Sequence, residues 1–353
     1  MRLKPFSSLH LCKSLQSTAP TFVSGEWLES NLSNDSVRVL HSSWNTCQDF
    51  DSVRIRSAVC FDGLACRDTK SPYRNMLPHP QLFQLYARNL GVNEDSHVVV
   101  YDASSARPSL DTAPRLWFMF RVFGHESVSI LRGGLFLWLK EHRPIEEGFE
   151  EVTKVPKGNL TARLNPNLVR SYEQVVQDIE SGEKLVVDAR NANRFSGAEP
   201  DVYHKEGIVK GAVNIPLRSL MEPASAGLLP PEQLRQKLAV LAEGKEAVVH
   251  CGTGIRACAV LAAAHSIGLT TPRLYDGSWH EFSARTPRLG WEVWLEPLLA
   301  LAKTEALRPR HCAAGTEASP ALEEEKEEKT LNTQKDSQEE LAQSHSAMPE
   351  NES

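Results

Sequence analysis

The sequence predicts an α/β fold made of two copies of one domain, each a parallel sheet flanked by helices. Short β-branched runs bounded by Gly, Asp or Lys are typical of buried strands, and here they alternate with amphipathic stretches. The predicted strands cover residues 37–40, 97–102, 184–190 and 246–251. Similar motifs return in the same order about 150 residues further on, which predicts a duplicated domain.

Three pairs of segments carry the repeat. Residues 55–62, 98–104 and 129–138 of the first half parallel residues 209–216, 247–253 and 272–282 of the second. Between the halves, residues 144–167 are polar and punctuated by Pro and Gly, as in a linker. We therefore expect an N-terminal domain over residues 21–145, a linker over 146–166 and a C-terminal domain over 167–302.

Two helices of the C-terminal half have clear sequence signals. Ser171 is followed three residues later by Gln174, a capping-box pattern ahead of apolar Val175. Residues 257–269 are rich in alanine, the best helix former, and reach their end near Gly268.

Charge is distributed unevenly along the 353 residues. The net charge is −6, but ten acidic residues and three lysines lie between Pro320 and Ser353. This stretch has few apolar residues to offset its chain entropy, so residues 303–353 are predicted to form a disordered acidic tail. The remainder is close to neutral, which gives no nucleic-acid footprint, and no apolar run reaches the ~18 residues of a membrane span.

The first twenty residues resemble a mitochondrial transit peptide. They are rich in Ser and Leu, contain Arg2, Lys4 and Lys13, and no acid appears before Glu26. A continuous apolar segment typical of a secretory signal is missing from this stretch. Residues 1–20 therefore predict a mitochondrial location, with a cytoplasmic location as the alternative.

The cysteines are irregularly spaced. Their number is odd and no C-x-x-C occurs, which argues against a disulfide framework and against a zinc site and favours a reducing compartment. Cys47, Cys60, Cys66 and Cys258 are expected to be buried core residues, with an exposed and oxidisable Cys66, which lies in a polar stretch, as the alternative. The seven are Cys12, Cys47, Cys60, Cys66, Cys251, Cys258 and Cys312.

Cys251 stands where chemistry is expected. It ends a predicted strand, a glycine-rich turn follows, and the alanine-rich helix begins directly afterwards. Such a turn points successive backbone N–H groups into one concavity beside a helix N-terminus, which stabilises an anion there. A cysteine in this place is expected to be largely a thiolate near neutral pH. Gly252 and Gly254 permit the turn, and the hydroxyl of Thr253 can donate to a charged sulfur.

The repeat indicates which domain is catalytic, and the spacing of the loop residues indicates the class of reaction. The first half has Asp102 where the second has Cys251, so the C-terminal domain is predicted to be catalytic and the N-terminal domain non-catalytic. Only four residues separate Cys251 from Arg256, whereas tyrosine phosphatase-like loops have five. The smaller ring suits a sulfane sulfur better than phosphate. The predicted persulfide loop is Gly252, Thr253, Gly254, Ile255 and Arg256.

The chain resembles the tandem rhodanese-domain sulfurtransferases, which act on thiosulfate or 3-mercaptopyruvate. The resemblance rests on residues 71–78, 96–104 and 113–134 in the first half and 187–200, 211–216, 251–257 and 275–282 in the second. It implies a persulfide on Cys251, a small-molecule sulfur donor, and cyanide or a thiol such as thioredoxin or glutathione as acceptor. It implies neither a metal nor an organic cofactor.

The resemblance also indicates the donor. Gly252-Thr253-Gly254 is similar to the loop of the 3-mercaptopyruvate enzymes, in which an arginine at the position of Arg194 grips the substrate carboxylate. Arg190 is either a second substrate contact or part of a structural ion pair. Three positions depart from that group: Tyr203 replaces an arginine, Asn75 a histidine and Arg256 a threonine. Arg256 favours an anionic donor such as thiosulfate.

Three alternatives stay open. A thiosulfate-preferring rhodanese is the first, a cysteine-based phosphatase or arsenate reductase the second, and a non-catalytic rhodanese-fold binding module the third. His250, Asp276 and Trp279 are expected to serve packing and turns, and residues 116–120 to be core or inter-domain surface.

Overall fold

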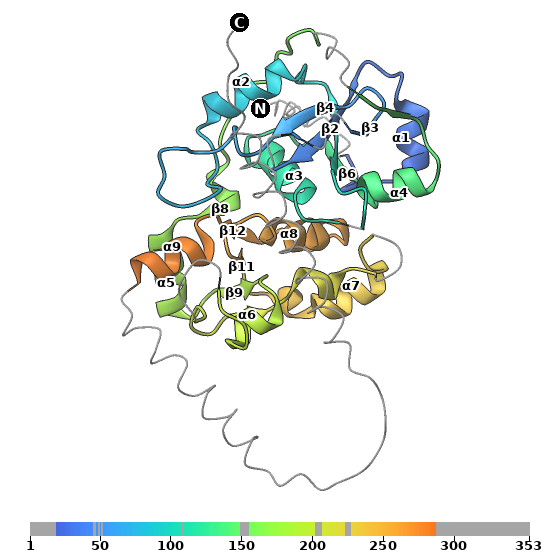
Figure 1. Cartoon of the computed structure of the whole chain (residues 1–353). Helices are drawn as coiled ribbons and strands as arrows, with labels where there is room; N and C mark the ends of the chain where they lie inside the picture. Colours follow the sequence, from blue (N-terminus) through green and yellow to red (C-terminus); the bar gives the residue numbers. More distant parts are fainter. Residues whose placement is uncertain are drawn as a thin grey trace, which may run out of the picture. The chain divides into compact units, whose positions relative to one another are not determined.

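The fold was obtained as a computed structural model, shown in Figure 1. It describes residues 19–44, 47–48, 50, 52–107, 109–148, 155–201, 207–222 and 227–286. Most of the predicted transit peptide and the whole acidic tail therefore lie outside the described residues.

The first sheet belongs to the N-terminal half of the chain. Its strand order is β1-β6-β5-β2-β4, and every neighbouring pair is parallel. The strands are β1 (Phe22–Val23), β2 (Val37–Ser43), β4 (Val59–Asp62), β5 (His97–Asp102) and β6 (Val128–Leu131). The helices are α1 (Gly25–Asn31), α2 (Pro80–Asn89), α3 (Ala113–Val122) and α4 (Gly134–Lys140). A small antiparallel pair joins β3 (Arg54–Ile55) to β7 (Ile145–Glu146).

The second sheet belongs to the C-terminal half. Its order is β10-β9-β11-β12-β8, again parallel throughout. The strands are β8 (Val169–Arg170), β9 (Leu185–Asp188), β10 (Val213–Asn214), β11 (Ala247–His250) and β12 (Arg273–Tyr275). The α-helices are α5 (Tyr172–Ser181), α6 (Ala192–Ser196), α7 (Pro231–Lys237), α8 (Ala257–Ser266) and α9 (Ser278–Arg285). Three short 3-10 helices, η1 (Pro166–Leu168), η2 (Leu217–Leu220) and η3 (Ala239–Ala242), complete it.

The two sheets have the same topology. Reading the second order backwards matches β8 with β1, β12 with β6, β11 with β5, β9 with β2 and β10 with β4. The central strands β5 and β11 end at Asp102 and immediately before Cys251. The predicted α/β fold with a duplicated parallel sheet is confirmed, and Asp102 and Cys251 occupy corresponding strand ends.

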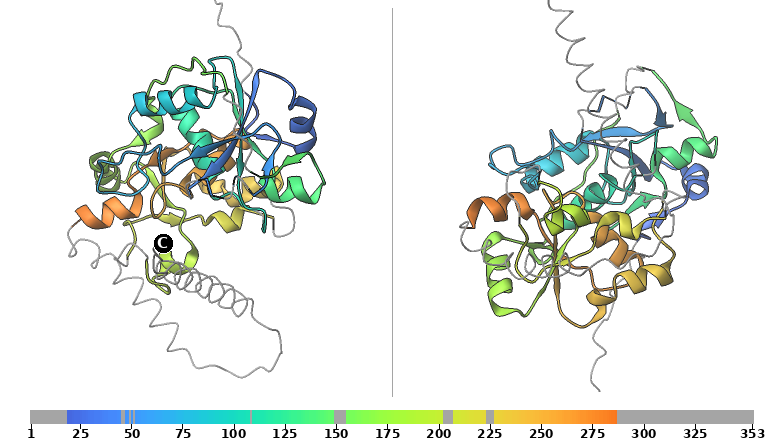
Figure 2. Two further views of the ribbon diagram at one scale, coloured as in Figure 1. Left: turned by 45° about the horizontal axis from the view of Figure 1, so that its top comes forward. Right: turned by 60° about the horizontal axis from the view of Figure 1, so that its bottom comes forward.

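Side chains alternate between the two faces of each sheet, as strand geometry requires. In β11, Val248 packs with α5 and α9 while Val249 packs with the cluster that includes α7 and α8. Figure 2 shows α5 and α9 on one side of this sheet and α7 and α8 on the other. Because both faces are covered, the strands are continuous apolar runs, which is why the sequence revealed them.

One strand is longer than predicted. The expected strand at residues 37–40 continues to Ser43, although His41, Ser42 and Ser43 are polar. All three are buried, and His41 Nδ1 lies 3.0 Å from the hydroxyl of Tyr101 on the neighbouring strand. Burial of the polar segment inside a parallel sheet is a tertiary effect that apolar patterning does not reveal.

Both helix-end predictions are confirmed. Ser171 accepts a hydrogen bond from the backbone N–H of Gln174, and the Gln174 side chain accepts one from Ser171 N–H. The alanine-rich helix ends at Ser266, and Gly268 follows with φ of +78°. Left-handed backbone of this kind after a helix is where glycine is favoured.

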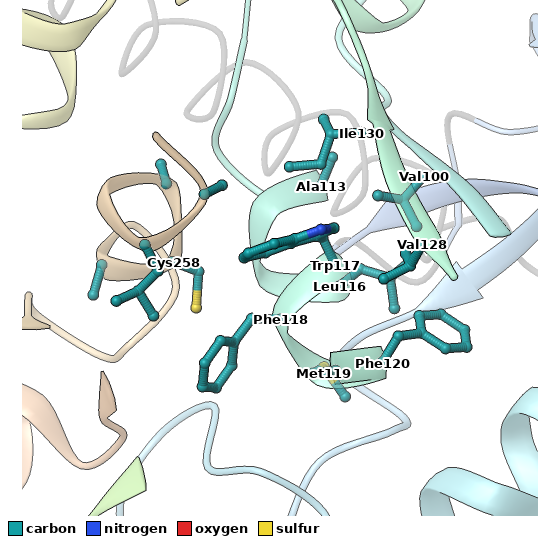
Figure 3. Packing of buried hydrophobic residues seen from close by; sticks show 14 of the residues in the cluster. Val100, Ala113, Leu116, Trp117, Phe118, Met119, Phe120, Val128, Ile130 and Cys258 are labelled. Atoms are coloured by element: carbon teal, nitrogen blue, oxygen red, sulfur yellow. The ribbon is translucent and has the colours of Figure 1, made fainter. Parts of the chain in front are cut away.

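One hydrophobic core continues from the first half of the chain into the second. Nine of the ten residues of α3 are buried, so this helix is covered on all sides. Figure 3 shows Trp117 and Phe118 of α3 beside α8, which carries Cys258, and the Trp117 ring lies 5.4 Å from that of His265. The expectation that residues 116–120 form core or inter-domain surface is confirmed.

The cysteines differ in part from the expectation. Cys47 and Cys60 form a disulfide, so the expectation of reduced core thiols was wrong for this pair. Cys60 lies on β4, which pairs with β2, and the chain after β2 brings Cys47 back to it. Irregular spacing cannot reveal such an encounter. Cys66 and Cys258 are 1% and 0% exposed, so both are buried core residues as expected, and the alternative of an exposed Cys66 is excluded.

Candidate active site

The loop of residues 251–256 connects the central strand β11 to α8. β11 pairs with β9 on one side and β12 on the other, so the loop begins at the carboxyl end of the middle of the sheet. Ligands of open parallel sheets bind at this edge. Cys251 is 4% exposed, and the helix that follows places its N-terminus beside the loop. This is the strand–turn–helix arrangement that the sequence predicts around Cys251.

The turn after β12 holds the backbone of Cys251 in place through hydrogen bonds. The Cys251 N–H donates to Ser278 Oγ at 3.2 Å, and Cys251 C=O accepts from the Trp279 N–H at 2.9 Å. The Gly252 C=O accepts from the His280 N–H at 3.0 Å. The predicted structural role of Trp279 is thus confirmed at its backbone, and its fully buried ring packs in the core below.

Gly254 is required by both its conformation and its surroundings. Its φ is +80°, a region that glycine enters without steric cost. A Cβ atom there would lie 2.7 Å from the Asp276 carbonyl oxygen. The Gly254 C=O in turn accepts from the Cys258 thiol at 3.3 Å. Burial raises the pKa of Cys258 to about 12, so this second thiol stays protonated and serves as a donor to the loop.

The N-terminal domain reaches the loop through residues 73–77. Asn75 Nδ2 donates to Thr253 Oγ1 at 3.0 Å, and the Arg74 N–H donates to His280 Nδ1 at 3.1 Å. Since Thr253 Oγ1 accepts from an amide, its own hydrogen is directed elsewhere and can be donated to an anion in the loop. Asn75 itself has φ of +61°, which asparagine tolerates better than most residues.

A buried ion pair lies directly behind the loop. Arg115 Nη1 of α3 is 2.7 Å from Asp276 Oδ1, and the two side chains are 1% and 9% exposed. Asp276 Oδ2 accepts from the Leu77 N–H at 2.7 Å. Burial alone would lower the pKa of Arg115, but the Asp276 carboxylate raises it above its ordinary value, so the guanidinium stays charged.

Arg256 occupies the outer edge of the loop. Its side chain is 52% exposed, and Nε lies 3.6 Å from Asp111 Oδ1 in the N-terminal domain. Asp111 Oδ2 accepts from Ser109 Oγ at 3.0 Å. The cation that the sequence placed in the loop is therefore accessible, but an acidic partner already stands beside it.

Arg190 is enclosed by protein acceptors. It donates to both oxygens of Asp188 through backbone and side chain, to Asp201 Oδ2 at 2.9 Å and to the Gly207 carbonyl at 2.8 Å. Its guanidinium also lies over the Trp279 ring, 4.6 Å from the centroid. This geometry favours the structural ion pair over the substrate contact among the two roles left open by the sequence.

Arg194 and His250 lie on elements around the loop. Arg194, near the end of α6, donates Nε to Glu199 Oε1 at 3.0 Å, and Nη2 lies 2.9 Å from the same oxygen. Its side chain is 21% exposed, and the Glu199 side chain is 28% exposed. His250 is fully buried, and burial lowers its pKa, which keeps the ring neutral. Tyr203 lies outside the described residues.

Three residues of the site were not predicted from the sequence: Asp111, Arg115 and Ser278, whose hydroxyl accepts from the Cys251 N–H. Arg115 had a signal, since it is a charge inside the otherwise apolar start of α3. The other two had none, because their partners are distant in the chain. Among the described residues no cluster of three His, Cys, Asp or Glu side chains suits a metal ion. No helix in the same residues is long and apolar enough to cross a membrane.

Comparison with known proteins agrees with this class of site, a cysteine loop on a duplicated α/β fold. The rhodanese-like domain family matches residues 24–141 and 171–285. The chain belongs to the rhodanese family, in its tandem sulfurtransferase form.

Individual relatives lie at about one-third identity. A thiosulfate sulfurtransferase of Rattus norvegicus is 35% identical over 283 residues, covering 75% of this chain and 92% of that protein. A 3-mercaptopyruvate sulfurtransferase of Homo sapiens is 35% identical over 297 residues, covering 79% and 95%. A crystal structure of a 3-mercaptopyruvate sulfotransferase from Escherichia coli has a TM-score of 0.65 at 32% identity, covering 74% and 99%.

Proposed function

We propose that this chain transfers a sulfane sulfur from 3-mercaptopyruvate or thiosulfate through a persulfide on Cys251. The observation that carries the proposal is the placement of Cys251 in a short, internally supported loop at the carboxyl end of the central strand. The relatives named above act on these two donors. Either donor delivers one sulfur atom to the thiolate.

The first half-reaction balances for both donors. With thiosulfate, the Cys251 thiolate attacks the outer sulfur, the S–S bond of thiosulfate breaks, and sulfite leaves with its electron pair. With mercaptopyruvate, the C–S bond breaks, and the donor's thiol proton ends on the carbon, which leaves as the methyl group of pyruvate. Both steps leave Cys–S–S⁻, and the N–H groups and the helix N-terminus of the loop are suited to that anion.

In the second half-reaction an acceptor attacks the outer sulfur of the persulfide. Cyanide leaves as thiocyanate and a thiolate as its persulfide, and each regenerates the Cys251 thiolate. We propose that thioredoxin or glutathione is the thiol acceptor in the cell. We propose also that residues 1–20 direct the chain to mitochondria. N-terminal sequencing of protein from cells tests this, because a mature chain that starts at Met1 or Arg2 contradicts import with cleavage.

The proposed roles within the site are supported by the contacts described above. Arg194 is proposed to take the carboxylate of mercaptopyruvate by exchange with Glu199, and Arg190 to support the strand end. Gly252, Gly254 and Ile255 shape the loop, and Thr253 donates its hydroxyl. The domain limits at 21–145, 146–166 and 167–302 stay predictions.

Thiosulfate as the preferred donor is the second candidate, and Arg256 favours it. The guanidinium is exposed at the loop edge and suits a dianion. The phosphatase alternative is disfavoured by the loop spacing, and the binding-module alternative predicts an unreactive Cys251.

The test is cyanide-dependent thiocyanate formation by the purified protein with each donor in turn. The Cys251→Ser variant is expected to lose transfer from both donors, since a hydroxyl cannot form the persulfide. Substantial turnover by that variant contradicts the mechanism. A phosphate-ester assay on the same preparation separates the phosphatase alternative, and inactivity of the wild type in every assay supports the binding module.

A further inference from the structure

Arg115 is an unusual member of helix α3. It is 1% exposed, and the other buried residues of that helix are apolar. An isolated charge in such surroundings is strongly unfavourable, so a buried arginine persists only with compensating partners. The partners of Arg115 show what it stabilises.

The guanidinium joins two segments that meet at the catalytic loop. Nη1 is 2.7 Å from Asp276 Oδ1 in the C-terminal domain, and Nη2 donates to the Asn75 carbonyl of the N-terminal domain at 2.6 Å. The other Asp276 oxygen accepts from the Leu77 N–H at 2.7 Å. One carboxylate is thus held by a side chain and by a backbone group of the opposite domain.

Asp276 in turn is in contact with the loop. Its carbonyl oxygen lies 2.7 Å from the point where a Cβ on Gly254 would stand, so the turn and the loop pack without space between them. Two residues later, Ser278 Oγ accepts from the Cys251 N–H. Any displacement of Asp276 is therefore transmitted to both ends of the segment between Cys251 and Gly254.

We propose that Arg115 is a positioning residue by which the N-terminal domain holds the persulfide loop in its reactive conformation through Asp276. The proposal rests on the proposed sulfur transfer and goes beyond it, because it gives a role in the reaction to the N-terminal domain, which is predicted to be non-catalytic. Arg115 touches neither donor nor persulfide. Its effect is to hold Asp276 and the turn up to Ser278 against the loop, which keeps Cys251 aligned for attack.

The main variant is Asp276→Asn, which keeps the side-chain shape and removes the charge. The matched control is Asp178→Asn, because Asp178 also pairs with an arginine, with Arg170 Nε at 3.3 Å and side-chain exposures of 15% and 10%. That pair lies between β8 and α5, away from the loop. Arg115→Lys keeps a charge but lacks the planar fork that reaches Asp276 and Asn75 together.

A double variant separates the effect of Arg115 on the position of the loop from its effect on the stability of the protein. Arg115→Met leaves Asp276 without its partner and is expected to lower the melting temperature, whereas Arg115→Met with Asp276→Asn leaves no uncompensated charge. Replacement of a whole buried pair is often neutral for stability. The double variant is therefore expected to recover the melting temperature and to keep the functional defect.

Two readouts are measured on each folded variant. One is kcat and KM for the better donor. The other is the rate of Cys251 alkylation by iodoacetamide, followed on the Cys251 peptide by mass spectrometry at neutral and alkaline pH. For Asp276→Asn and the double variant we expect kcat to fall about 100-fold with little change in KM. We expect Cys251 alkylation to slow about 10-fold at both pH values, because the displaced loop presents the sulfur less well to the reagent. Asp178→Asn is expected to behave as wild type.

Two results overturn the proposal. One is wild-type kcat and alkylation in the folded double variant. The other is an equal loss in Asp178→Asn, which would mean that any weakened ion pair has the same effect. If wild-type protein transfers sulfur from neither donor, the proposed function fails instead, and the alkylation profiles still decide whether Arg115 positions the loop.

Discussion

At the residue scale, Arg256 and Asp111 form an ion pair that joins the two domains. The pair is half-exposed, so its attraction is modest and screened by salt. Its location matters more than its strength, because the acid reduces the positive field at the edge of the loop. The balance between thiosulfate, a dianion, and mercaptopyruvate, a monoanion, is expected to depend on it.

Replacing Asp111 with Asn should shift the donor preference. Removal of one negative charge beside Arg256 favours the dianion more than the monoanion, so the ratio of kcat/KM for thiosulfate over mercaptopyruvate should rise about threefold at low salt. Steady-state assays with both donors measure it. The same change in an Arg256→Ala background is the control and should leave the ratio unchanged. An unaltered ratio in the single variant contradicts the role of the pair.

At the element scale, the two domains contain the same strand–turn–helix unit and use it in different ways. In the C-terminal domain the unit β11–loop–α8 presents Cys251. In the N-terminal domain the unit from β5 to α3 presents Asp102, whose Oδ1 accepts from the N–H groups of Thr112 and Ala113 and from the Thr112 hydroxyl. The Asp102 carboxylate thus accepts from the free N–H groups at the N-terminus of α3. The position that an external anion could take at this helix is therefore filled by a side chain of the protein.

The loop of the C-terminal unit depends on Gly254. Gly254→Ala should lower kcat/KM about 10-fold or more, because the new Cβ meets the Asp276 carbonyl and displaces the loop. Gly182→Ala is the matched control, since Gly182 has φ of +65° and open space around it. It should cost about 1 kcal/mol of stability without affecting activity. Equal activities of the two variants would rule out this dependence.

Asp102 should make the stability of the N-terminal unit depend on pH. Burial raises its pKa from 3.8 to about 6 in the folded state. A raised folded pKa adds stability at low pH that is lost as pH rises through about 6. Relative to Asp102→Asn, the wild type should lose on the order of 3 kcal/mol between pH 4 and pH 7. Urea unfolding of both proteins across this range measures the difference. A pH-independent difference contradicts the prediction.

At the scale of the whole molecule, the two domains share one hydrophobic core. The hydrophobic cluster that contains Phe118 of α3 also contains the buried residues of α8. Joint burial of apolar surface couples the unfolding of the two halves. Domains of one chain often unfold separately, but a continuous core favours a single transition.

Phe118→Ala should weaken this coupling. The loss of the ring is expected to cost about 3–5 kcal/mol and to divide thermal unfolding into two transitions. Phe61→Ala is the matched control, because Phe61 is fully buried within the first domain, against Phe83 and Tyr86. It should lower the melting temperature and keep one transition. Differential scanning calorimetry distinguishes the two patterns, and a single transition in both variants would contradict the assignment.

Local patterns in the sequence determined the elements of this protein. Apolar strands covered on both faces and the Ser171 capping box were visible because each depends on neighbours in the chain, and the repeat was visible because the same local motifs return in the same order. The place of Cys251 at the end of a strand and before a helix was visible for the same reason. These features sufficed for the fold class, the family resemblance and the candidate nucleophile.

Contacts between distant residues were decided only by the tertiary structure. The Cys47–Cys60 disulfide, the enclosure of Arg190, the Arg256–Asp111 pair and the Arg115–Asp276 pair all depend on how strands order themselves and how the two domains meet. Periodicity and residue spacing carry no information about such encounters, because the path of the chain after a strand and the packing of the two domains, rather than local geometry, bring these partners together. For this reason the sequence predicts a catalytic C-terminal and a non-catalytic N-terminal domain, whereas the structure adds the contacts that the N-terminal domain makes with the C-terminal loop and the turn behind it.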